Sequence, residues 1–143
     1  MPRMVAVQSD GCCPIVNAFE KGERFAEPVD DAATIAGGLR VPAAVGDFMM
    51  LDVIRESDGC AVAVSEQRLT EWMRLGTEAE GITIGPESAA CIGAAEKLHE
   101  SGWLTPHERV VIFSCGGAKK YPELIRADLP RIDKDNLPDW DSF

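Results

Sequence analysis

The sequence has little positive charge and no long apolar run. It contains 14 Lys and Arg residues against 24 Asp and Glu residues, which gives a formal net charge of −10 at pH 7. Proteins that bind nucleic acid need a basic face, so we expect no nucleic-acid partner. No apolar stretch approaches the roughly 20 residues that cross a membrane, and no segment resembles a signal peptide. These features predict a cytoplasmic protein without membrane association.

Histidine is scarce, and the cysteines lack the spacing of metal ligands. The two histidines, His99 and His107, stand in polar surroundings, so we interpret both as surface residues and find little support for a His-based catalytic dyad. The five cysteines are Cys12, Cys13, Cys60, Cys91 and Cys115. Their odd number predicts free, mostly buried thiols in a reducing compartment and no metal site. Cys115 as a nucleophile would need a nearby base, so thiol catalysis is a lesser alternative.

The composition is that of a globular domain. The chain has 143 residues, of which 45% are hydrophobic. This length fits one domain that buries a core without disulfide or metal staples. We assign residues 1–127 to the domain and interpret the aspartate-rich residues 128–143 as a solvated acidic tail.

Apolar runs alternate with amphipathic segments along the chain. Strands are predicted at residues 4–8, 60–64 and 109–113. Helices are predicted to begin near Pro14, Asp47, Ser65 and Pro86. Continuous apolar strands separated by helices indicate a parallel sheet with helices on its faces. We therefore predict a three-layer α/β/α fold with a mostly parallel sheet.

The third predicted strand ends in Ser114, Cys115, Gly116 and Gly117. Ligands of parallel sheets bind beyond the carboxyl ends of the strands, where this loop and residues 9–12 are expected. The loop has three interpretations: a tight turn, a cradle of backbone N–H groups for an anion, or a hydroxyl for the ring nitrogen of a ligand. Composition alone favours the turn. Glu87 stands at the start of a predicted helix, and its simplest interpretation is a negative charge that complements the helix dipole.

The order of five segments along the chain favours a cofactor-binding interpretation of this loop over a simple turn. They read MVAVQSDGCCPIVNAFEKG, TIAGGLRVP, ESDGCAVAVSEQRL, EGITIGPESAACIGAAEKLHESGWL and VVIFSCGGAKK. This succession, from about residue 2 to residue 121, resembles threonine synthases, which are pyridoxal-phosphate (PLP) enzymes with the tryptophan-synthase-β fold. The resemblance implies that this chain is a partial PLP domain of that fold.

The resemblance also implies a cofactor site. In that family, a Ser or Thr hydroxyl at the end of the corresponding strand meets the pyridine nitrogen of PLP, in a loop that reads Thr-Gly-x-Gly-Leu-Lys. Ser114 keeps the hydroxyl and Gly117 keeps a glycine, whereas Cys115 replaces a glycine. Glu87 falls in a segment that reads Pro-Glu-Gly-Ala-Ala in the family, with Ser88 in place of the glycine. The cofactor-binding residues implied are Ser114, Cys115, Gly116, Gly117 and Glu87.

Two parts of the family's site have no counterpart in this sequence: the Schiff-base lysine and the glycine-rich phosphate loop. No catalytic residue is therefore assigned, and the chain is expected to be a C-terminal portion that does not bind PLP by itself. Complete relatives convert O-phosphohomoserine and water to threonine and phosphate. A lysine-bearing N-terminal half or a second copy is the expected partner, with a small amino acid as substrate. The alternatives are a non-catalytic binding or assembly module and part of a threonine or serine dehydratase.

Overall fold

The computed structural model describes residues 2–125 and residue 135. The strands and helices are β1 (Val5–Ser9), α1 (Pro14–Glu20), α2 (Asp47–Glu56), β2 (Cys60–Val64), α3 (Leu69–Glu80) and α4 (Pro86–Glu100). Four 3-10 turns complete the order: η1 (Gly37–Leu39), η2 (Glu66–Arg68), η3 (Ala118–Lys120) and η4 (Pro122–Leu124). None of the helices described is long and apolar enough to cross a membrane. The predicted acidic tail, residues 128–143, lies outside the described residues except for Asp135.

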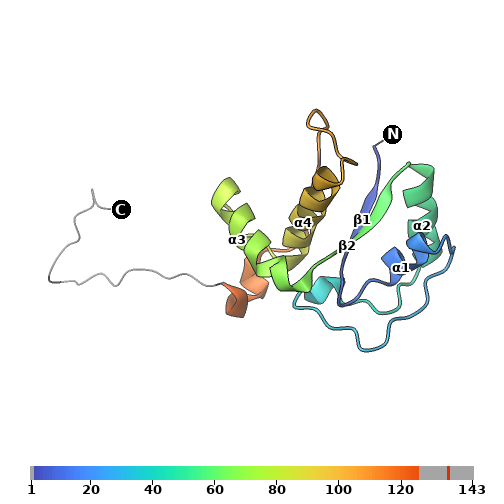
Figure 1. Cartoon of the computed structure of the whole chain (residues 1–143). Helices are drawn as coiled ribbons and strands as arrows, with labels where there is room; N and C mark the ends of the chain where they lie inside the picture. The colour runs from blue at the N-terminus through green and yellow to red at the C-terminus, as the bar shows by residue number, and fades with distance from the viewer. Residues whose placement is uncertain (1, 126–134, 136–143) are drawn as a thin grey trace.

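The sheet is parallel and lies between two layers of helices. β1 and β2 pair in register from Val5 opposite Cys60 to Ser9 opposite Val64. Helices α1 and α2 cover one face and α3 and α4 the other, with β1 and β2 between them (Figure 1). The predicted three-layer α/β/α class with a parallel sheet is confirmed. The predicted helices all form, although the one expected from Ser65 begins as η2 before α3.

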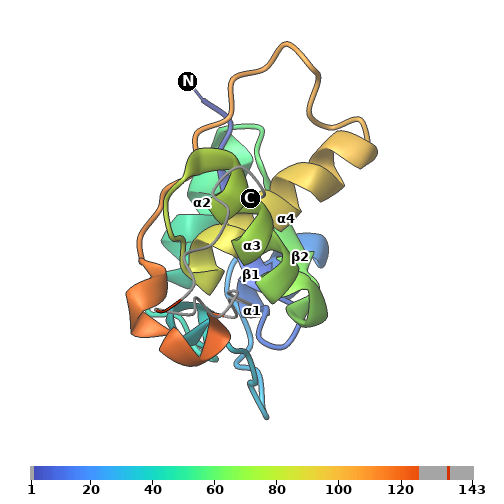
Figure 2. The ribbon, with the colours of Figure 1, turned by 90° about the vertical axis from the view of Figure 1, so that its left-hand side faces the viewer.

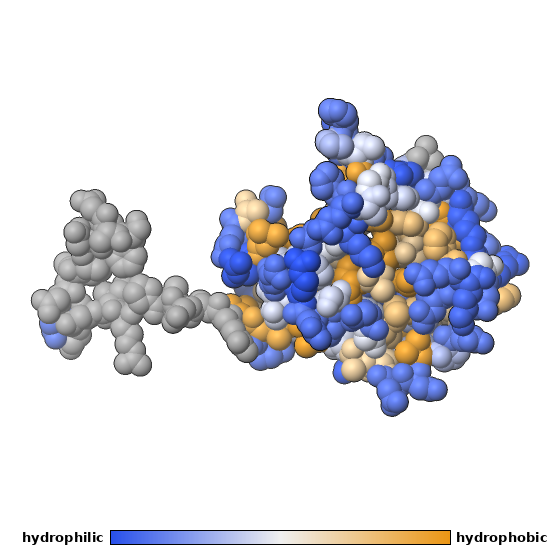
Figure 3. Space-filling view, viewed as in Figure 1, coloured by the Kyte–Doolittle hydropathy of each residue, from blue (hydrophilic) through white to orange (hydrophobic). Residues whose placement is uncertain are grey.

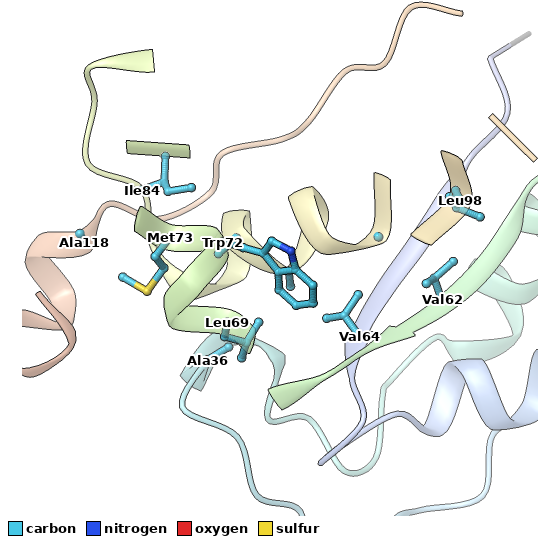
Figure 4. Packing of buried hydrophobic residues seen from close by; sticks show 12 residues of the cluster. Ala36, Val62, Val64, Leu69, Trp72, Met73, Ile84, Leu98 and Ala118 are labelled. Atoms are coloured by element: carbon cyan, nitrogen blue, oxygen red, sulfur yellow. The ribbon is translucent and has the colours of Figure 1, made fainter. Parts of the chain in front are cut away.

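A hydrophobic core fills the space on each side of the sheet. The larger cluster joins Val62 and Val64 of β2 to α3 and α4, and the indole ring of Trp72 points toward Val64 (Figure 4). The α4 backbone approaches this ring closely, because a Cβ placed on Gly93 would lie 2.6 Å from indole carbon atoms of Trp72. The smaller cluster consists of Ile15, Ala18, Leu51 and Ile54, between α1 and α2.

The third predicted strand does not form. Residues 109–113 are irregular and follow the outside of the molecule between the end of α4 and η3 (Figure 2). Their apolar side chains are exposed, with Val111 at 74% and Phe113 at 76%. A strand needs a neighbouring edge for its backbone hydrogen bonds. In the described part of the chain β1 and β2 pair only with each other, so the prediction of at least three strands is wrong there.

The thiols are less buried than predicted. All five cysteines are free, but only Cys12 is buried, while Cys115 is exposed and the other three are half-buried. His99 and His107 are both exposed, as predicted. Within residues 2–125 and 135, no group of three or more His, Cys, Asp or Glu side chains is placed to hold a metal ion.

Candidate cofactor site

The loops that follow β1 and β2 are tied to each other. The buried Ser9 hydroxyl donates a hydrogen bond to Glu66 Oε2 at 2.5 Å, and the Glu66 N–H donates to Asp10 Oδ1 at 2.9 Å. Gly11 lies so close to a neighbouring loop that a Cβ there would be 1.9 Å from the carbonyl oxygen of Ala33. These contacts hold the loop after β1 against the loop after β2 at the carboxyl edge of the sheet.

The predicted loop lies against the first turn of α4. The N–H of Gly85 donates to the carbonyl oxygen of Gly116 at 2.9 Å. The hydroxyl oxygens of Ser88 and Ser114 lie 3.1 Å apart, within hydrogen-bond distance. Ser88 is buried, whereas Ser114 is exposed. The structure therefore brings together the loop and the segment of Glu87, which are 26 or more residues apart in sequence.

The Glu87 carboxylate is enclosed by backbone and by one phenol. Its Oε1 accepts hydrogen bonds from the N–H of Gly38, at 3.0 Å, and from the hydroxyl of Tyr121. A Cβ on Gly38 would lie 2.9 Å from Oε1, and a Cβ on Gly85 would lie 2.9 Å from Oε2. The buried Oε2 has no hydrogen-bond partner among the described residues. At Gly85 a Cβ would also lie 2.9 Å from the backbone carbonyl oxygen of Gly116, so a larger residue there would have to displace backbone as well as the carboxylate.

The enclosure shifts the titration of both partners. Burial raises the pKa of the Glu87 carboxyl. Hydrogen bonds from Tyr121, from the N–H of Glu87 itself and from Gly38, together with the charge of Lys120, have the opposite effect. They outweigh burial, so the pKa of Glu87 lies below its ordinary value. The hydrogen bond to Glu87 raises the pKa of the Tyr121 hydroxyl. Near neutral pH the pair is therefore a carboxylate that accepts from a neutral phenol.

Tyr121→Phe is expected to raise the pKa of Glu87 and to lower the free energy of unfolding by about 1 kcal/mol near neutral pH. Because the folded pKa of Glu87 is depressed, its contribution is present above the unfolded pKa and is lost as pH falls through the folded pKa. The difference between the proteins should therefore shrink in acid. NMR titration of the Glu87 side chain and urea unfolding across pH check both effects. An unchanged Glu87 pKa in the variant would contradict this role of Tyr121.

The other two predicted loop residues take no part in this contact. Cys115 is exposed, and its thiol lies 3.4 Å from the carbonyl oxygen of Phe113. A Cβ on Gly117 would meet no atom within 4 Å, so no close approach requires a glycine there. Burial raises the pKa of the Cys91 thiol, and the nearby Cys115 adds to the effect. A raised pKa disfavours the reactive thiolate.

An apolar hollow of about 550 Å³ adjoins the two serines. It is lined by Leu75, Gly76, Ala79, Glu80, Ile82, Ile84, Ser88, Ile92, Ile112 and Ser114. The hydroxyls of Ser88 and Ser114 thus stand beside apolar side chains of α3, α4 and the link between them. A small number of polar groups in a mainly apolar hollow is the usual composition of a small-molecule site.

Sequence reasoning missed Tyr121, Gly38 and the Ser88–Ser114 contact. Tyr121 is the only tyrosine of the chain, but nothing around it indicated a partner 34 residues away. The sequence did show that Ser88 stands in place of the family's glycine next to Glu87. That replacement was a signal for a second hydroxyl at the site.

Residues 1–116 match the family model described as "Pyridoxal-phosphate dependent enzyme". The chain belongs to this family of PLP-dependent enzymes. It is 36% identical over 123 residues to the threonine synthase of Methanocaldococcus jannaschii, a match that covers 86% of this chain and 30% of the relative. It is 31% identical over 125 residues to the threonine synthase of Methanosarcina acetivorans, covering 87% of this chain and 31% of that one. The resemblance to threonine synthases is confirmed.

The fold of the PLP-dependent family is also found among solved structures. A crystal structure of the T.th. threonine deaminase matches with a TM-score of 0.54 and 23% identity, over 71% of this chain and 35% of that chain. This similarity supports the fold alone. The chain spans about a third or less of the length of the curated threonine synthases named above.

The residues present fit one end of PLP. A neutral hydroxyl at Ser114 is a suitable partner for the ring nitrogen, and the apolar side chains of the hollow suit the faces of the ring. The phosphate end does not fit the start of α4. A helix N-terminus usually favours an anion, but here the carboxylate of Glu87 lies in the first turn of α4 and would repel a phosphate.

Proposed function

We propose that this chain supplies the ring-nitrogen end of the PLP site of a cytoplasmic threonine-synthase-like enzyme. As in the relatives it resembles, the reaction would convert O-phosphohomoserine and water to threonine and phosphate. The lysine that bonds PLP and the loop that holds its phosphate would come from a further segment, on the same polypeptide or on another. The similarity to the threonine synthases of M. jannaschii and M. acetivorans supports this choice among PLP enzymes.

The observation that carries the proposal is the Ser88–Ser114 contact. A hydroxyl donates one hydrogen bond and accepts others. If Ser88 donates to Ser114, the proton of Ser114 is left for the ring nitrogen of the cofactor. A neutral hydroxyl does not force protonation of that nitrogen, as a carboxylate would. When bound, PLP supplies an electron sink for proton transfers at the substrate carbon atoms.

Glu87 has a supporting role in this proposal. Its carboxylate accepts from Gly38 and Tyr121, and the Gly85–Gly116 hydrogen bond lies beside it. These contacts fix the first turn of α4 and the loop against each other. Glu87 therefore helps to position the loop that follows Ser114, while the acid–base groups of the reaction are assigned to the further segment.

The test uses a complementing segment, which we define as the M. jannaschii threonine synthase without the region that this chain matches. It is produced together with the full 143-residue chain, and threonine formation from O-phosphohomoserine is measured. We expect activity that falls about tenfold in Ser114→Ala, which corresponds to the loss of one hydrogen bond, and that largely persists in Ser114→Thr.

The matched control is Ser101→Ala, because that hydroxyl only caps the end of α4 by donating to Leu98 O at 3.0 Å. Its activity should equal that of the parent chain. Equal activity in Ser114→Ala would remove Ser114 from the cofactor site. Formation of 2-oxobutanoate from threonine, without threonine from O-phosphohomoserine, would favour the dehydratase alternative, and the absence of both products would favour a non-catalytic module.

A further inference from the structure

The segment that carries Ser114 places alternate side chains on opposite sides. Ile112 and Ser114 line the apolar hollow, whereas Val111 and Phe113 are absent from that lining and are 74% and 76% exposed. Successive side chains of an extended segment point to opposite sides. Cys115, the next residue, is exposed as well. The loop therefore presents the Ser114 hydroxyl to α4 and turns the Cys115 thiol away from it.

The loop runs along the first turns of α4 in the opposite direction. Gly116 accepts the N–H of Gly85 at 2.9 Å. Two residues earlier in the loop and three residues later in the helix, the hydroxyl oxygens of Ser114 and Ser88 lie 3.1 Å apart. Cys91 follows Ser88 by three residues, and residues with this spacing are neighbours on a helix surface. The loop therefore lies beside the part of α4 that carries Cys91.

The thiols of Cys91 and Cys115 are close to each other and free. Burial raises the pKa of the Cys91 thiol, and Cys115 raises it further, which requires the two sulfur atoms to lie close enough for their charges to interact. Cys91 is half-buried and Cys115 is exposed. In reducing compartments a disulfide between such thiols is usually transient and senses oxidants. The pair therefore has the arrangement of an exposed thiol with a second thiol nearby to resolve it.

The loop is accessible and is free to turn. Leu75 and Ile82 on the rim of the hollow are 47% and 57% exposed, and Figure 3 shows apolar residues reaching the surface at the α3 side of the molecule. Among the described residues, the N–H groups of residues 110–114 donate to no backbone carbonyl. Glycines at 116 and 117 follow the thiol, and glycine adopts the widest range of backbone conformations. Turning the loop therefore breaks no helix or strand.

We propose that a peroxide joins Cys91 and Cys115 in a disulfide that turns Ser114 away from Ser88 and so weakens the cofactor site. A disulfide holds its two Cβ atoms about 3.8 Å apart, so Cys115 has to turn toward α4. Because Ser114 and Cys115 point to opposite sides of the loop, only one of them faces α4 at a time. The effect on the cofactor rests on the proposed function, whereas the disulfide itself does not.

The oxidation proceeds in two balanced steps. The Cys115 sulfur attacks hydrogen peroxide, so that the O–O bond breaks, an S–O bond forms, the sulfur loses two electrons and water leaves. The Cys91 sulfur then attacks this sulfenic acid, so that the S–S bond forms and the S–O bond breaks, and the hydroxyl group leaves as water with the thiol proton. Two thiols and one hydrogen peroxide thus give one disulfide and two water molecules. Dithiothreitol reverses the bond by thiol–disulfide exchange.

The first test treats the full chain, at low concentration, with hydrogen peroxide and identifies disulfides by mass spectrometry of unreduced peptides. We expect a bond between Cys91 and Cys115 within one molecule, lost in Cys91→Ser and kept in Cys13→Ser. Cys13 is the matched control because its thiol is also half-buried. Amide exchange followed by NMR should be at least about tenfold faster at Gly85 in the bridged chain, because its N–H loses the acceptor on Gly116.

The second test mixes the bridged chain with the complementing segment and titrates PLP, followed by its absorbance. We expect an affinity at least about tenfold weaker than with the reduced chain, and dithiothreitol should restore it. This readout does not depend on turnover.

The remaining outcomes separate this inference from the proposed function. A disulfide to another cysteine, a link between two copies through Cys115, or the absence of any disulfide would overturn the inference and leave the proposed function standing. The same holds if the Cys91–Cys115 bond forms but leaves either the exchange of Gly85 or a measurable affinity for PLP unchanged. If the bond forms and Gly85 exchanges faster, but the mixture binds no PLP in either state, the turning of the loop is supported and the proposed function is rejected.

Discussion

Gly59→Ala is expected to destabilise the chain by more than about 3 kcal/mol, at the upper end of the effects of single substitutions. A Cβ at this position would lie 1.8 Å from the carbonyl oxygen of Met4 and 3.0 Å from its nitrogen. The same oxygen accepts the N–H of Cys60 at 3.2 Å, at the point where the two strands begin to pair. Backbone cannot rotate away as a side chain can, so the alanine would separate β1 from β2.

Gly117→Ala is the matched control. Gly117 has φ −90° and ψ 154°, which alanine adopts without strain, and a Cβ there meets no atom within 4 Å. Urea unfolding followed by circular dichroism compares the free energies of unfolding of the two variants with the parent. Equal stability of Gly59→Ala and the parent would show that the contact between Met4 and the turn before β2 is not as close as described.

The sequence predicts the layers of this fold better than it predicts the size of the sheet. The run at 60–64 and the run at 110–113 are both short, apolar and bounded by polar or glycine residues. The first becomes β2 because β1 lies beside it, and the second stays irregular because the described chain offers it no partner. An apolar pattern reports that a segment is suited to burial, but it carries no information about the neighbouring edge.

In the candidate site, too, some residues could be predicted from the sequence and others depend on how distant elements pack. Ser114 and Glu87 follow from the order of motifs, and the structure places their segments in contact through the Gly85–Gly116 hydrogen bond. Tyr121 and Gly38 could not be predicted, because their contacts with Glu87 depend on how η1 and η3 pack around the start of α4. Cys115 and Gly117 match the family's loop in position but make no contact that explains their identity.

The chain alone is expected to bind PLP far more weakly than micromolar. Ser114 offers one neutral hydrogen bond, which contributes about 0.5–1.5 kcal/mol net, whereas micromolar affinity needs roughly 8 kcal/mol. The Glu87 carboxylate at the start of α4 disfavours the phosphate there. Lys119 and Lys120 can react with the aldehyde adventitiously, but that reaction should be weak and unaffected by Ser114→Ala.

The claim that this chain provides one end of a PLP site is tested most directly by titrating PLP, followed by its absorbance, against the chain, the complementing segment and the two together. We predict that the two together bind PLP stoichiometrically and at least about tenfold more tightly than the complementing segment alone. Ser114→Ala should reduce this gain in affinity, and Ser101→Ala should leave it unchanged. Tight binding by the chain alone that Ser114→Ala abolishes, or binding by the complementing segment that the chain does not improve, would contradict the account.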